Sequence, residues 1–141
     1  MRFSTKTRYG IRAALEIAQS ECEEGIYQKE ISAKQKISYK YLDHIIHSLK
    51  VAGLVRKAAG RKSGYVLTRP PSDISIYDIH RAFEPGICVI DCMSNGYTCD
   101  REEYCKAKGF WGKLNKQIIE YFQSTSLQDL IDNEVVLEDL E

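Results

Sequence analysis

The stretch ISYKYLDHIIHSLKVAGLV, residues 37–55, decides the fold because it contains one amphipathic helix together with both of its ends. Ser38 stands where a hydroxyl accepts a backbone N–H of the first turn, and Gly53 stands where a chain leaves a helix in the left-handed conformation. This pattern predicts a helix over residues 39–52. Apolar side chains recur along it at helical spacings, at Tyr41, Leu42, Ile45, Ile46 and Leu49.

Two shorter apolar patterns precede this helix. Residues 5–20, with Ser4 as N-cap, predict a first amphipathic helix, and residues 28–34 predict a second. A turn at residues 35–37 joins the second helix to the third. Two short helices joined so closely, the second opening with polar residues, are typical of a helix-turn-helix.

Two short alternating runs follow, at residues 54–57 and 65–68. A basic loop, residues 58–64, separates them and contains Gly60 and Gly64. This arrangement predicts a β-hairpin with a longer loop. Added to the helix-turn-helix, the hairpin is the wing of a winged helix-turn-helix.

The second half of the chain predicts three more helices. A diproline at residues 70–71 marks a hinge, and Ser75 caps the helix after it. A long helix over residues 107–123 carries an apolar stripe broader than a lone helix keeps in water, and Ser126 caps a last helix over 127–131. The predicted fold class is therefore mainly α with a small β-hairpin wing.

Composition predicts a folded globular domain. The 141 residues are 43% hydrophobic and 28% charged, unlike a disordered chain. No stretch reaches the roughly 20 apolar residues that cross a bilayer, and cations such as Arg2, Lys6 and Arg8 interrupt any apolar leader. We therefore expect a cytoplasmic protein with no membrane partner.

The formal net charge is zero, with 20 Lys or Arg and 20 Asp or Glu, but it is a sum of two opposite halves. Residues 1–69 hold 14 basic and 6 acidic residues, a net of +8, whereas residues 70–141 hold 6 and 14, a net of −8. A basic half that contains a helix-turn-helix predicts binding to double-stranded DNA.

The predicted DNA contacts lie at three places. The third helix presents its N-terminal turns, where backbone N–H groups and the helix dipole add to side-chain donors. The wing with its flanks, and the first helix, offer cations for a minor groove or for phosphates. The candidates are Arg2, Lys6, Arg8, Ser38, Tyr39, Lys40, Asp43, His44, Arg56, Gly60, Arg61 and Lys62.

Three of the five cysteines, Cys92, Cys99 and Cys105, are spaced C-x6-C-x5-C in a polar segment. A reducing compartment argues against disulfides, and thiolates on a loop can converge on one metal centre. The spacing fits an iron–sulfur cluster with one non-cysteine ligand or a Cys₃ zinc site, and its wide gaps favour the cluster. The alternative is three unligated thiols. Cys88 is a further ligand, a redox partner or a packed small residue.

Several short motifs are spread over almost the whole chain: MRFSTKTRYG at residues 1–10, Ile37-Ser38 with Tyr41-Leu42, Gly53-Leu54-Val55, Gly64-Tyr65-Val66-Leu67, and SLQDL at 126–130. Together they resemble the IscR-type family of bacterial winged-helix transcription regulators. The three cysteines fall where that family holds its cluster, and we expect [2Fe–2S] rather than [4Fe–4S]. The resemblance also implies a homodimer built around the long helix, with each protomer presenting one winged helix-turn-helix to a DNA half-site.

Three positions depart from the family pattern. The IscR branch has a histidine ligand three residues after the third cysteine, where this chain has Lys108. The nitric-oxide-sensing branch draws a carboxylate from near the partner's N-terminus, at the position that is Arg8 here. The usual wing arginine is Ala59, so Arg61 is its candidate replacement. The fourth ligand stays open between Cys88, Asp91, Asp100, Glu102, Glu103, a residue of the other subunit and an exogenous thiol.

These observations predict a homodimeric transcription regulator that senses iron–sulfur cluster status, redox state or nitric oxide. Residues 1–69 would be its DNA-binding domain and residues 70–141 its cysteine-loop sensor and dimerisation region. One alternative is a cluster-free regulator with a thiol switch at Cys88 and Cys92, and another is a small metal-binding electron-transfer protein. An enzyme is not expected, because no nucleophile–base or nucleotide-binding motif stands out.

Overall fold

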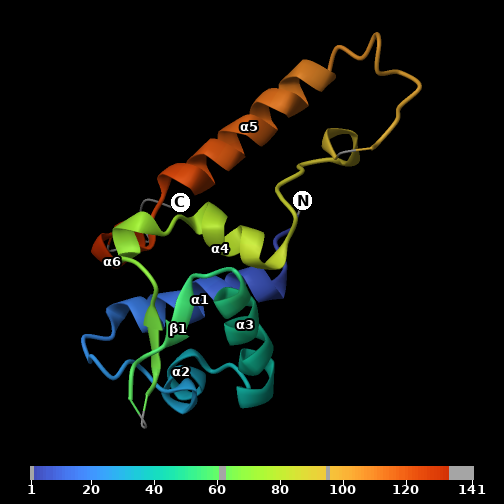
Figure 1. Ribbon diagram of the computed structural model, residues 1–141. Coiled ribbons are helices and arrows are strands. Elements are labelled where there is room, and N and C mark those ends of the chain that lie inside the picture. The colour runs from blue at the N-terminus through green and yellow to red at the C-terminus, as the bar shows by residue number, and fades with distance from the viewer. Residues whose placement is uncertain (1, 61–62, 95, 134–141) are drawn as a thin grey trace.

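The computed structural model describes residues 2–60, 63–94 and 96–133, and Figure 1 shows its course. The predicted fold class is confirmed, because the chain is mainly helical and its described strands form one antiparallel hairpin. Each helix whose range was predicted begins and ends within one residue of the observed helix, and the helix after Ser75 begins directly after that cap. The elements are α1 (Thr5–Gln19), α2 (Gln28–Gln35), α3 (Tyr39–Val51), β1 (Val55–Lys57), β2 (Tyr65–Leu67), η1 (Pro71–Asp73), α4 (Ile76–Phe83), η2 (Asp91–Met93), α5 (Lys108–Ser124) and α6 (Leu127–Asp132).

Serine N-caps explain why the starts of α1, α3, α4 and α6 were predictable, whereas α2 and α5 begin without a side-chain cap. Each capping hydroxyl accepts a hydrogen bond of 3.0 to 3.2 Å from the backbone N–H three residues later, at Ser4, Ser38, Ser75 and Ser126. At α4 and α6 an aspartate in the first turn accepts the serine N–H in return, which completes a capping box. Removing such a cap typically costs about 1 kcal/mol, so these sites fix where the helices begin.

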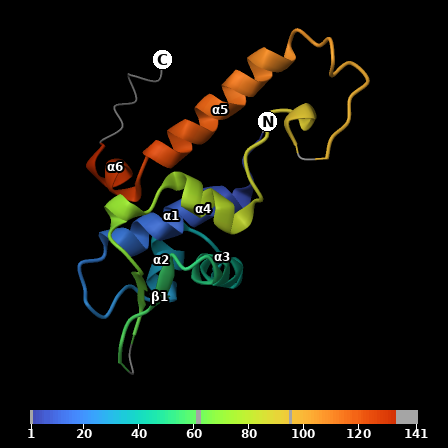
Figure 2. The ribbon, with the colours of Figure 1, turned by 45° about the horizontal axis from the view of Figure 1, so that its top comes forward.

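Helix α1 lies at the centre of the fold, with α4 along one side and α2 and α3 on the other (Figure 1, Figure 2). Its small residues let the neighbours approach closely, and a Cβ atom on Gly10 would collide with the ring of Phe83 in α4. Ile17 of α1 and Leu127 of α6 belong to the same buried cluster. The core therefore continues across the charge boundary after residue 69.

The segment before α6 is joined to the segment before α4 by two backbone hydrogen bonds. The N–H of Ile76 donates to the carbonyl of Thr125, and the N–H of Leu127 donates to the carbonyl of Ile74, both at 2.9 Å. Leu127 is fully buried. This pairing fixes the C-terminal end of the described chain into the central core.

The wing is joined to the connection between α1 and α2. Val55 pairs with Leu67 within the hairpin. Tyr65 extends the ladder outward, because its N–H donates to the carbonyl of Ile26 at 2.8 Å and its carbonyl accepts the N–H of Ile26 at 3.1 Å. A Cβ atom on Gly64 would lie 2.6 Å from the carbonyl oxygen of Ile26. A residue without a side chain is therefore needed where the wing meets this connection.

Helix α5 rises away from the central core (Figure 1). None of its residues is buried, and Phe110 and Tyr121 are 63% and 69% exposed. Near its C-terminal end Phe122 stacks on Phe3, with 5.2 Å between the ring centroids. The predicted apolar stripe of α5 is thus only partly covered by the chain itself.

Among the residues that the structure describes, no helix combines the length and hydrophobicity of a membrane span.

Substitution of Gly64 by Ala tests how tightly the wing is held. We expect Gly64→Ala to lower the free energy of unfolding by about 1–3 kcal/mol, because the new methyl group meets backbone atoms of Ile26 that cannot rotate away. Urea unfolding followed by circular dichroism measures the change. Gly109→Ala is the matched control, because a Cβ atom there meets nothing within 4 Å and alanine favours a helix. Equal unfolding midpoints for the two variants would contradict the close contact.

Candidate nucleic-acid interface and cysteine site

The first two turns of α3 present a polar face, as predicted. Tyr39 is 55% exposed, and Lys40, Asp43 and His44 are exposed beside it. The opposite face of α3 is buried in the core through residues such as Leu42. The packing of the helix therefore determines which side chains face outward, and these four are grouped at one end of it.

The other predicted DNA contacts are not all on this surface. Arg56 and Gly60 are exposed on the wing, and Lys6 and Arg8 are exposed on the first turns of α1. Arg2 instead lines a small hollow at the start of the segment that holds four of the five cysteines, residues 86–109, which we call the cysteine segment. The predicted contacts Arg61 and Lys62 lie outside the described residues.

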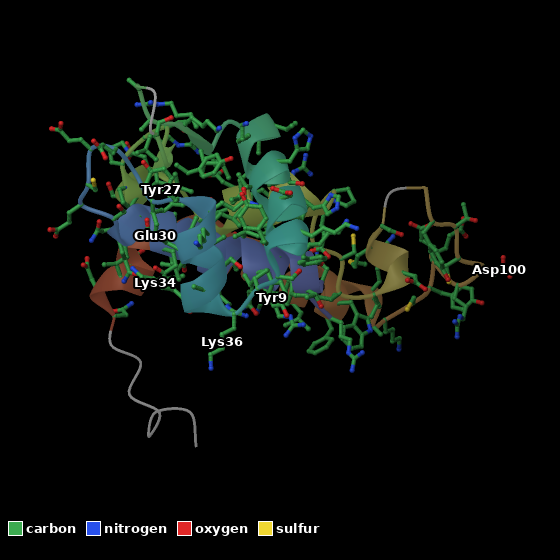
Figure 3. All side chains as sticks on the ribbon, turned by 90° about the horizontal axis from the view of Figure 1, so that it is seen from below. Tyr9, Tyr27, Glu30, Lys34, Lys36 and Asp100 are labelled. Carbon is green, nitrogen blue, oxygen red and sulfur yellow. The ribbon has the colours of Figure 1, made fainter. Side chains whose placement is uncertain are left out.

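A cleft of about 370 Å³ separates α2, α3 and the wing. Figure 3 shows this side of the molecule, with Tyr27 just before α2, and Glu30 and Lys34 along that helix. Burial is the main cause that raises the pKa of Tyr65 in this cleft, and the nearby groups of Tyr39 and Asp43 raise it further. The lining residues are Tyr27, Gln28, Lys29, Glu30, Tyr39, Lys57, Ser63, Gly64 and Tyr65.

The sequence pattern did not single out Gln28, which ties α2 to α3. Its side chain is almost buried, with 9% of the residue exposed. Its amide nitrogen donates to the backbone carbonyl of Tyr39 at 3.2 Å and to Oδ1 of Asp43 at 2.5 Å. The only sequence sign was its position three residues before Ile31, on the buried side of α2.

Cys92, Cys99 and Cys105 line one hollow of about 420 Å³ between η2 and the start of α5. Two of these cysteines are half-buried and Cys105 is exposed. Cys88 does not line this hollow and lies in the smaller one that Arg2 lines. The hollow is completed by Ile90, Asp91, Tyr97, Arg101, Glu102, Ala107, Lys108 and Trp111.

The donor chemistry of this hollow suits a sulfur-ligated centre, although the loop is open. Within residues 2–60, 63–94 and 96–133, no three His, Cys, Asp or Glu side chains are grouped closely enough to hold one metal ion. Lys108 and Glu102 are engaged with each other at 2.5 Å. This hydrogen bond raises the pKa of Lys108 and lowers that of Glu102, and the Cys92 and Cys105 thiols also raise the pKa of Lys108.

A buried polar contact joins the start of the cysteine segment to α1. His80 is 2% exposed, and its Nε2 lies 3.1 Å from the carbonyl oxygen of Gly86. Its Nδ1 lies 2.8 Å from Oε2 of Glu84, without the alignment of a hydrogen bond. The same carboxylate oxygen accepts the hydroxyl of Thr7 in α1 at 3.1 Å. The sequence pattern gave no sign of this contact, because it depends on how the chain turns after α4 and on Thr7, which is far away in the sequence.

Comparison with known proteins gives a consistent result. The model of the Rrf2 family, described as iron-dependent transcriptional regulators, matches residues 3–133. Protein rrf2 of Nitratidesulfovibrio vulgaris is 31% identical over 131 residues, which are 93% of this chain and 87% of that protein.

Two solved structures of regulators are similar over most of their length. The global cysteine regulator CymR of B. subtilis has a TM-score of 0.74 and 31% identity, covering 92% of this chain and 95% of that one. The IscR protein of T. potens has a TM-score of 0.73 and 33% identity, covering 100% of this chain and 89% of that one. The resemblance to IscR-type regulators is thereby confirmed.

Proposed function

Because this chain belongs to the Rrf2 family of transcriptional regulators, we propose that it binds an operator as a homodimer and adjusts its DNA affinity through an iron–sulfur cluster. Its relatives named IscR and CymR are transcriptional regulators, which confirms that the chain is not an enzyme and counts against an electron carrier. The observation that carries the finer proposal is the common hollow of Cys92, Cys99 and Cys105.

The exposed turns of α3 are the part of the chain that would enter the major groove. Lys40 lies at the N-terminal end of this helix, where its ammonium and the helix dipole both attract phosphates or base acceptors. Arg56 and Lys57 on the wing would contact the flanking backbone. The cleft between α3 and the wing supports this docking, because Lys29 and Lys57 both line it.

Substitution of Lys40 tests the docking. We expect Lys40→Ala to weaken operator binding about tenfold, the effect of losing one good contact to a base or phosphate. Fluorescence anisotropy over a range of salt concentrations measures it, on a duplex selected from a randomised pool by the wild-type protein. If the lost contact is to phosphate, the log–log salt slope falls by roughly 0.9.

Lys113→Ala on α5 is the matched control for this experiment, because it removes another exposed lysine, one that lies in the acidic half. It should leave both the affinity and the salt slope unchanged. Equal losses in Lys40→Ala and Lys113→Ala would mean that α3 does not face the DNA.

Helix α5 supports the homodimer. Its apolar stripe includes Trp111, Leu114 and Ile118, yet α5 has no buried residue in the single chain. A broad apolar face on a helix that leaves the core calls for a covering surface. Pairing of two α5 helices about a two-fold axis would cover it and would place two α3 helices on one DNA duplex.

A charge placed on this stripe tests the dimer. We expect Tyr121→Glu to raise the dimer dissociation constant by about tenfold or more, because an interface aromatic is replaced by a charge. Analytical ultracentrifugation measures the dissociation constant, and circular dichroism should show unchanged helix content, because Tyr121 is 69% exposed. Gln123→Glu adds the same charge at another exposed position and should dimerise like the wild type. Unchanged assembly of Tyr121→Glu would argue against pairing through α5.

Three thiolates, from Cys92, Cys99 and Cys105, would hold the cluster, whose iron supplies the response to redox state or to nitric oxide. The loop would have to close around it, since the described side chains do not yet converge. Among the candidate fourth ligands of this chain, Asp91 and Glu102 line the hollow. Glu102 is already paired with Lys108, which favours Asp91.

The root of the cysteine segment supports a route from the cluster to the DNA. Closing the loop would move Gly86, whose carbonyl contacts His80. His80 lies against Glu84, and Glu84 accepts the hydroxyl of Thr7, so the movement would reach α1. The cysteine segment is also coupled to α5, because the side chain of Asn115 in that helix accepts the N–H of Val89 at 2.9 Å. A change at the hollow would therefore alter how α1 and α5 are held, and with them the separation of the two α3 helices in a dimer.

Removal of single thiols tests the sensor. After anaerobic reconstitution we expect iron and acid-labile sulfide in the wild type, and their loss in Cys92→Ser, Cys99→Ser and Cys105→Ser, because a serine hydroxyl is a poor substitute for a soft thiolate. Metal analysis with absorption spectroscopy measures both. Cys22→Ser is the control, since Cys22 lies after α1 and away from the hollow. A wild-type protein that takes up no iron would exclude the cluster.

That outcome would favour the second candidate, a cluster-free regulator with a thiol switch. The open arrangement of the thiols and the similarity to a cysteine regulator support it. The switch would join Cys88 to Cys92, and mass spectrometry after mild oxidation would identify the disulfide.

A further inference from the structure

We infer that Gln28 is a positioning residue, which fixes the carboxylate of Asp43 so that α3 discriminates one base pair. The inference rests on the proposed DNA-binding function. It adds a residue of α2 that does not itself need to touch the DNA.

The side chain of Gln28 is placed so that its amide restrains α3. The side chain is almost buried, and a buried amide is stable only when its donors find acceptors. Both acceptors belong to α3: the backbone carbonyl of Tyr39 at 3.2 Å and Oδ1 of Asp43 at 2.5 Å. One amide group therefore holds the start of α3 and a side chain of its second turn at once.

Asp43 differs from the other side chains on the exposed face of α3 because it is negatively charged. It is the one acidic residue of α3, and a carboxylate on a face that meets DNA cannot bind phosphate. What it can accept is the amino group of a base, and the N4 amino group of cytosine is the usual partner in the major groove. With Oδ1 occupied by Gln28, the structure describes no hydrogen bond to the other oxygen, Oδ2.

The restraint determines what Asp43 contributes. Without the hydrogen bond from Gln28, the carboxylate of Asp43 would rotate among its rotamers and would hold no fixed position relative to a base. Its charge also helps to raise the pKa of Tyr65 on the wing, after the larger effects of burial and of Tyr39. Gln28 thus acts on selectivity at one base pair, rather than on the overall attraction to DNA.

The test compares base preferences of the full-length protein and of Gln28→Met, which keeps the length of the side chain but has no donor. The wild type selects its preferred duplex from a randomised pool, and anisotropy then measures binding to that duplex and to each of its single-base-pair variants. We expect the wild type to disfavour replacement of one cytosine pair per half-site about tenfold. Gln28→Met should lose most of this preference and keep the preferences elsewhere and the salt slope.

A double-variant comparison separates positioning from a general structural effect. In an Asp43→Ala background, Gln28→Met should change no base preference, because the side chain that it positions is absent. Gln19→Met is the matched control, since Gln19 is exposed at the end of α1. If Gln28→Met does not fold, Gln28→Asn keeps an amide in place that is too short to reach Asp43, and should show the same loss.

The failures of the two proposals are distinguishable. If the wild type selects a sequence and Gln28→Met, or Gln28→Asn in its place, keeps the full discrimination, the role of Gln28 is wrong while DNA binding stands. Equal effects of Gln28→Met with and without Asp43 would also overturn it. If the wild type selects no sequence, the proposed function fails, and the inference fails with it.

Discussion

The narrowness of α1 is the constraint on which the rest of the structure depends. Its alanines and Gly10 leave room for α3 on one side and α4 on the other, and a Cβ atom at Gly10 would already collide with Phe83. Protein interiors are packed too densely to absorb such a collision without moving a neighbour. Because α3 carries the polar face and α4 leads into the cysteine segment, one helix sets the position of both candidate sites.

Local rules made most of the fold predictable. Serine caps and apolar periodicity defined the helices, because both depend only on residues that are three or four positions apart in the sequence. The same rules said nothing about how the cysteine segment, with its lack of periodicity, would fold into a hollow. They also missed Gln28 and His80, whose partners lie on other elements or past the end of their own helix. The exposed face of α3 was predictable, and the side chains that restrain it were not.

The two candidate sites lie far apart, so a change at the cysteine hollow can affect α3 only through the helices packed between them. Figure 3 places Asp100, on the cysteine segment, at the opposite end of the molecule from Tyr27. No direct contact joins η2 to α3 among the element pairs with substantial contact in the described chain. A change in the hollow would travel through α1 or through α5, or directly from α4 to α3, because these two helices are in contact. The contact of Thr7 with Glu84 lies on the first of these routes and the hydrogen bond of Asn115 lies on the second.

The pairing of the segments before α4 and α6 has a consequence for how the protein is made. Leu127 fills the core beside α1, so the N-terminal half cannot complete its packing until nearly the whole described chain has left the ribosome. Until then the nascent chain exposes an apolar patch that chaperones and proteases recognise. A chain that ended before α6 would leave this part of the core open to solvent. The short helix α6 therefore completes a core whose other members come largely from the first half of the chain, so the two halves reach their final packing together.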